Sequence, residues 1–94
     1  MKVLIADDEK LIRDVIKEYC LGSGYEVLEA VNGIEAVEKA EQADIIVLDI
    51  MMPKMDGFTA YKLIKEKYNT PTIMLSARGE EYDKLAGFDL GIDD

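Results

Sequence analysis

Short apolar runs alternate with segments of helical periodicity along the chain, and this alternation restricts the possible folds more than any other feature. Strand-like runs lie at residues 3–6, 25–30, 45–48 and 72–75, and helical patterns at about residues 10–21, 33–40, 57–68 and 81–88. The runs at 3–6 and 45–48 are apolar throughout, as in strands buried on both faces. We therefore predict an α/β fold with a doubly wound parallel sheet and right-handed crossovers.

Residues typical of helix ends support this division. Gly22-Ser23-Gly24 follows the first helical pattern, where glycine adopts the left-handed cap without steric cost. Asn32 precedes the second helix, and Asp56 precedes the third as an N-cap. The first helix has an apolar side and an opposite polar side, which we expect to face solvent. Its polar side consists of Arg13, Asp14, Lys17 and Glu18.

Polar residues follow three of the predicted strands. Asp7 and Asp8 come after the first apolar run and Asp49 after the third, while Ser76 follows the fourth. Ligands of doubly wound sheets bind at the carboxyl ends of the strands, so we expect these side chains to converge. Three carboxylates there would repel one another by roughly 4 kcal/mol per pair at about 4 Å, unless a hard cation such as Mg²⁺ lies among them. The pattern predicts a Mg²⁺-dependent phosphate-handling site, in which the central aspartate holds the metal, accepts a phosphoryl group, or does both.

Each of these residues also has a purely structural interpretation. Asp7 and Asp8 could be the N-cap and first-turn acid of the helix that follows, because acids are favoured at that end of a helix. Asp49 could simply end a strand, and Ser76 could be a polar residue at a strand end. The lone Cys20 is best interpreted as a small core residue.

Composition excludes several classes of partner. The 94 residues carry a net charge of −9, from 20 acidic and 11 basic side chains. Affinity for nucleic acids and anionic membranes comes mainly from Lys and Arg, so we expect neither as a partner. No apolar stretch approaches the ~20 residues that span a bilayer, and no signal-peptide pattern opens the chain. We expect a cytoplasmic protein of one domain.

Three sequence blocks resemble the receiver domains of two-component response regulators. They are Val-Leu-Ile-Ala-Asp-Asp-Glu at residues 3–9, Asp-Ile-Met-Met-Pro-Lys-Met-Asp-Gly at 49–57 and Pro-Thr-Ile-Met-Leu-Ser-Ala at 71–77. Residues 77–84 and 91–94 are most similar to the OmpR/PhoB-like subgroup, which carries a C-terminal winged-helix DNA-binding domain. The resemblance implies a flavodoxin-like sheet with strand order 2-1-3-4 in this chain.

The resemblance also implies a role for each site residue. Asp49 matches the phosphoacceptor, Asp8 the direct Mg²⁺ ligand, and Asp7 the residue that holds metal-bound water. Met51 matches the position that binds Mg²⁺ through its backbone carbonyl, and Ser76 matches the switch hydroxyl. The implied partner is a sensor histidine kinase, and the implied output is control of transcription by a domain outside this chain. Such a domain is no enzyme but a phosphoacceptor that assists its own phosphorylation and dephosphorylation.

In the family, a fifth strand, a lysine, an aromatic switch residue and a last helix would follow Asp94. We therefore expect residues 1–94 to be a receiver domain truncated before its fifth strand. The strand at residues 72–75 would then be an exposed apolar edge, which can pair with another chain. We expect a homodimer or a segment swap through this edge, or disorder of the last residues.

The sequence argues against two functions other than signalling. A phosphatase of the haloacid dehalogenase type needs a second aspartate two residues after its nucleophile, and here that residue is Met51. An interaction domain that has lost phosphorylation would not need the acids at 7, 8 and 49. Met51 and Arg78 lie two residues after Asp49 and Ser76, where the resemblance places the path of an attacking water. Met51 offers no hydrogen bond to orient that water and Arg78 is no base, so we also expect slow self-dephosphorylation.

Overall fold

The strands form one parallel sheet. The structure is a computed structural model and describes residues 1–75. The strands are β1 (Lys2–Ala6), β2 (Glu26–Ala30), β3 (Ile45–Asp49) and β4 (Thr72–Leu75), and they pair in parallel in the order β2-β1-β3-β4. The predicted fold class and strand order are confirmed. The helix expected at residues 81–88 lies outside the described residues.

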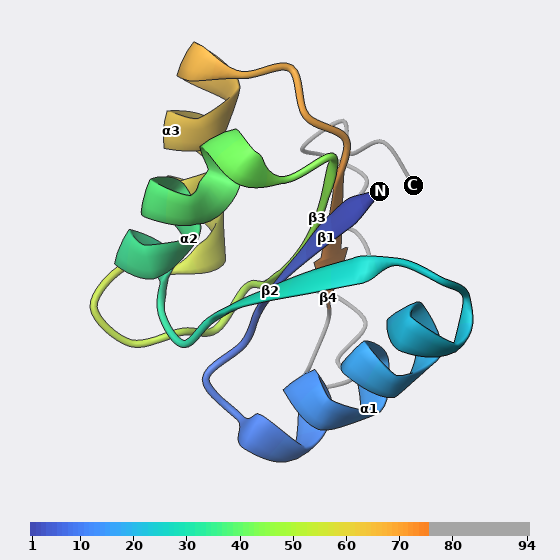
Figure 1. Cartoon of the computed structure of the whole chain (residues 1–94). Coiled ribbons are helices and arrows are strands. Elements are labelled where there is room, and N and C mark those ends of the chain that lie inside the picture. Colours follow the sequence, from blue (N-terminus) through green and yellow to red (C-terminus); the bar gives the residue numbers. More distant parts are fainter. Residues whose placement is uncertain (76–94) are drawn as a thin grey trace.

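Helices cover both faces of this sheet. Helix α1 (Lys10–Gly22) lies on one face, while α2 (Gly33–Lys39) and α3 (Gly57–Lys67) lie together on the other (Figure 1). A short 3₁₀ helix, η1 (Ala40–Gln42), extends α2. Within residues 1–75, no helix is long and apolar enough to cross a membrane.

The predicted helix ends are confirmed. Gly24, just after α1, has a φ of +87°, which favours glycine. Asn32 Oδ1 accepts a hydrogen bond from the N–H of Glu35 at 2.9 Å, so Asn32 caps α2. Asp56 Oδ1 accepts one from the N–H of Thr59 at 2.8 Å and caps α3. Each cap satisfies a backbone donor that the helix itself leaves without a partner.

The hydrophobic core lies between the sheet and the α2–α3 layer. It consists of Leu4, Ala6, Ala30, Ala36, Ala40, Ile46, Leu48, Met52, Ala60, Tyr61 and Ile64. Strand β1 is buried from Val3 to Ala6, as its apolar run predicts for a central strand. In β3 the residues facing this core, Ile46 and Leu48, are buried, while Val47 on the other side is only half-buried.

The α1 face of the sheet differs from the simple amphipathic expectation. The apolar side of α1 divides: Leu11 and Tyr19 are 80% and 76% exposed, whereas Ile12 and Ile16 are half-buried. On its polar side, Arg13 has a side chain only 12% exposed, so the expectation of a solvated polar face is wrong at this residue. The reason is a set of hydrogen bonds to the ends of β1 and β2, which is described below.

Candidate functional site

Strand register places two of the predicted aspartates side by side. Ala6, the last residue of β1, pairs with Leu48 in β3. The next residues along the two strands are Asp7 and Asp49, and both are fully buried. Neighbouring parallel strands end at the same edge of a sheet, so residues 42 positions apart in sequence become neighbours.

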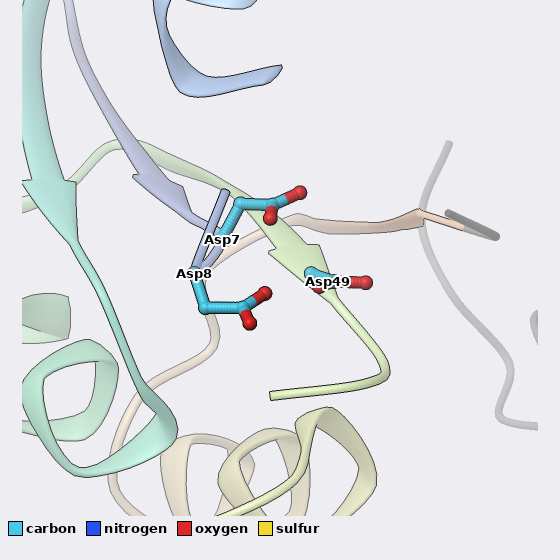
Figure 2. A group of neighbouring side chains, drawn as sticks. All are labelled: Asp7, Asp8 and Asp49. Carbon is cyan, nitrogen blue, oxygen red and sulfur yellow. The ribbon is translucent and has the colours of Figure 1, made fainter. Parts of the chain in front are cut away.

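Asp8 joins this pair. One carboxylate oxygen from each of Asp7, Asp8 and Asp49 can be chosen so that all lie within 4.8 Å of one another. Figure 2 shows the three carboxylates extending to the same side of the strand ends. Asp8 is exposed, whereas its two neighbours are not. The site is therefore buried on the sheet side and open on the Asp8 side.

The same type of local turn fixes each of the two buried carboxylates, Asp7 and Asp49. Asp7 Oδ1 accepts a hydrogen bond from the N–H of Glu9 at 2.8 Å. Asp49 Oδ1 accepts one from the N–H of Met51 at 3.2 Å. Aspartate often bonds the backbone two residues ahead in this way where a chain leaves a strand. The turn also answers the capping question, because the N-cap of α1 is Glu9 rather than Asp7 or Asp8.

The loop after Asp49 is held close to the strand by glycine. The N–H of Gly57 donates to the carbonyl of Ile50 at 2.8 Å. A Cβ at Gly57 would lie 2.3 Å from the carbonyl oxygen of Asp49, so no side chain fits there. Met51, in the same loop, is 45% exposed and contributes its backbone N–H to the site. The proposed use of its carbonyl as a metal ligand stays a prediction.

The structure thus brings together three of the predicted site residues and leaves others untested. Asp7, Asp8 and Asp49 converge as the strand ends predict. Ser76 and Arg78 lie outside the described residues, so the switch and dephosphorylation roles assigned to them stay predictions.

Two residues beside the site were missed by the sequence analysis. Arg13 Nη1 donates to the carbonyl oxygen of Asp7 at 2.8 Å, and Arg13 Nε donates to Glu29 Oε1 at 3.0 Å. The hydrogen bond from Arg13 has the largest effect on the pKa of Glu29 and, although burial raises this pKa, Arg13 and Lys17 together hold it below its ordinary value. The periodicity of the helix that contains Arg13 and of the strand that contains Glu29 does not predict this contact, because the contact depends on how α1 crosses the sheet.

The donor set fits a hard divalent cation. Three carboxylates offer oxygen ligands and negative charge within a few ångströms. Mg²⁺ prefers such oxygen ligands, keeps several waters, and is usually bound by one or two carboxylates together with phosphate. A partly open cluster of this kind can hold a cation and still admit a phosphoryl group.

Fold and site together define a class: a doubly wound parallel sheet with an acidic cluster at the carboxyl ends of its central strands. Residues 3–94 match the sequence pattern of the response regulator receiver domain family. The chain belongs to this family.

Individual relatives agree. Transcriptional regulatory protein ResD of Bacillus subtilis is 45% identical over 95 residues, which cover 99% of this chain but 40% of ResD. The chain therefore spans well under half of this curated relative.

Solved structures give the same result. A receiver domain of the Francisella response regulator 1452 superposes with a TM-score of 0.85 at 40% identity, covering 99% of this chain and 79% of that one. A CheX–CheY–BeF3–Mg²⁺ complex from Borrelia burgdorferi has a TM-score of 0.79 at 36% identity, covering 93% of this chain and 72% of that one.

Proposed function

We propose that this chain is a phosphoacceptor signalling domain, which receives a phosphoryl group from a sensor histidine kinase on Asp49 in a Mg²⁺-dependent reaction. The convergence of Asp49 with Asp7 and Asp8 at one sheet edge is the observation that carries the proposal. The similar Borrelia complex, which contains CheX, CheY, BeF3 and Mg²⁺, supports the proposal by similarity.

The chemistry follows from a carboxylate nucleophile. An oxygen of Asp49 attacks the phosphorus of a phosphohistidine, so that the O–P bond forms as the P–N bond breaks and the imidazole leaves with the electron pair. Asp8 would hold Mg²⁺ directly, Asp7 through water, and Met51 through its carbonyl. A bound Mg²⁺ would offset the negative charge of the phosphoryl oxygens. Ser76 would then bond the transferred group and report its presence.

The product is a lasting acyl phosphate rather than a turnover intermediate. Hydrolysis would need a group that orients or activates water near Asp49, and Met51 offers an exposed thioether there. We therefore propose assisted phosphorylation with slow self-dephosphorylation, and no phosphatase activity toward other substrates.

The output is proposed by similarity. Because ResD is a transcriptional regulatory protein and the chain covers 40% of it, we propose that phosphorylation controls a transcription-regulating segment elsewhere in the same protein. We also propose a cytoplasmic location and pairing of two copies through β4. Among residues 1–75, β4 is an outer strand of the sheet, so one of its edges has no partner strand there.

The proposal is tested by mass. Incubation with acetyl phosphate and Mg²⁺ should add one phosphoryl group, about 80 Da, visible by intact-protein mass spectrometry. The adduct should disappear with EDTA and in Asp49→Asn. The matched control is Asp56→Asn, because Asp56 is an exposed N-cap outside the cluster and asparagine caps equally well. An adduct that persists in Asp49→Asn, or forms without divalent ions, would contradict the proposal.

A further inference from the structure

The two adjacent aspartates pose a geometric problem. In an extended strand, consecutive side chains point to opposite faces of the sheet. Asp7 and Asp8 are consecutive, yet their carboxylates reach the same cluster as Asp49. The chain therefore has to leave the strand geometry directly after Ala6, where β1 ends. The orientation of the peptide that links Asp7 to Asp8 decides whether both side chains face Asp49.

Arg13 bonds to that peptide. Its Nη1 donates to the carbonyl oxygen of Asp7 at 2.8 Å, and this carbonyl belongs to the Asp7–Asp8 peptide. The Arg13 side chain is only 12% exposed, so water competes poorly for this bond. A charged donor also makes a stronger hydrogen bond than a neutral one.

The guanidinium is itself fixed from the other side. Arg13 Nε donates to Glu29 Oε1 at 3.0 Å, and Glu29 lies on β2, the strand that pairs with β1. The next residue of β2, Ala30, accepts the backbone N–H of Asp7 at 3.0 Å. The peptides before and after Asp7 are therefore both tied to the end of β2, one directly and one through Arg13.

We propose that Arg13 is a positioning residue of the metal centre, which with Glu29 holds the Asp7–Asp8 peptide so that both carboxylates face Asp49. This inference rests on the proposed function, because it concerns Mg²⁺ binding at the same site. The proposed effect of Arg13 on Mg²⁺ binding does not come from its charge. A cation near the cluster disfavours Mg²⁺ by repulsion, so loss of Arg13 through its charge alone would tighten binding. Loss of positioning would weaken it.

Loss of charge and loss of positioning would change Mg²⁺ affinity in opposite directions, so a binding measurement separates the two effects. Mg²⁺ affinity is measured by isothermal titration calorimetry on the wild-type chain and on Arg13→Ala, Arg13→Lys and Glu29→Gln, with folding checked by circular dichroism. Loss of a residue that orients metal ligands typically weakens binding by about 10–100-fold, and we expect a loss of this size in Arg13→Ala. Arg13→Lys should also bind Mg²⁺ weakly, because an ammonium group lacks the planar guanidinium whose separate nitrogens donate to Glu29 and to the Asp7 carbonyl. Glu29→Gln should fall between Arg13→Ala and the wild type.

Lys17→Ala is the matched control. Lys17 is a cation one turn further along α1 that donates to Glu29 Oε2 at 3.2 Å. Its removal should leave Mg²⁺ affinity unchanged or slightly higher. Wild-type affinity or better in a folded Arg13→Ala overturns the inference, and if that variant does not fold, Arg13→Lys decides in the same way. Absence of Mg²⁺ binding in the wild type, or full binding in Asp8→Asn, would instead overturn the proposed function, and the inference with it.

Discussion

At the scale of single residues, Gly57 lies so close to the backbone of Asp49 and Ile50 that no side chain fits at this position. A Cβ at Gly57 would meet the Asp49 carbonyl oxygen at 2.3 Å and Ile50 Cα at 2.7 Å, and both are backbone atoms that cannot rotate away. We expect Gly57→Ala to lower the free energy of unfolding by about 1–3 kcal/mol, as overpacking does. Urea denaturation measures this loss. Phosphorylation by acetyl phosphate should also slow, because Asp49 must move.

A second glycine provides the comparison. A Cβ at Gly22, in the last turn of α1, would have no atom within 4 Å. Gly22→Ala should therefore raise the unfolding free energy by a few tenths to ~1 kcal/mol through the helix propensity of alanine. Equal effects of the two substitutions would show that the close approach at Gly57 does not constrain the loop.

At the scale of elements, α2 depends on its N-cap. It has only seven residues, which is too short for a stable helix on its own. Asn32, which is buried, accepts the N–H of Glu35, and Glu35 Oε1 accepts the N–H of Val31 at 3.1 Å. We expect Asn32→Ala to cost about 1 kcal/mol in chemical denaturation. Asn32→Ser keeps an acceptor oxygen and should recover most of the lost stability. Wild-type stability of Asn32→Ala would show that the cap does not stabilise α2.

Element boundaries were well predicted because local chemistry sets them. Gly24, Asn32 and Asp56 act within a few residues of themselves, so the sequence contains the whole interaction. The partition of the α1 surface was not predictable in this way. The same periodicity contains exposed Leu11 and half-buried Ile12, and only the crossing of α1 over the sheet separates them.

The site shows the same limit. Asp7, Asp8 and Asp49 were predictable, because strand ends in a parallel sheet meet at one edge whatever the details of packing. Arg13 was assigned to solvent because its neighbours on the helix are polar. Arg13 joins α1 to the ends of β1 and β2, and no local sequence pattern predicts a contact among three elements.

At the scale of the whole molecule, β4 is an outer strand of the sheet that residues 1–75 form, which leads to a prediction about association. We expect a dimer whose fraction rises with concentration in size-exclusion chromatography with light scattering. Ile73→Lys should shift it to monomer, since lysine on an outer strand opposes edge pairing. Tyr19→Lys is the control, because Tyr19 is 76% exposed and lies on α1, which packs against β1 and β2. A monomer at every concentration, or a dimer lost only in Tyr19→Lys, would contradict pairing through β4.

The unequal exposure of the three acids has a kinetic consequence. Because Asp7 and Asp49 are fully buried and Asp8 is exposed, an ion can arrive from the Asp8 side while β1 and β3 stay paired. Entry and departure then need no breathing of the sheet. The slow step would be the loss of water from the ion itself, which Mg²⁺ gives up reluctantly. Exchange rates at this domain should accordingly follow the identity of the cation more closely than the stability of the protein.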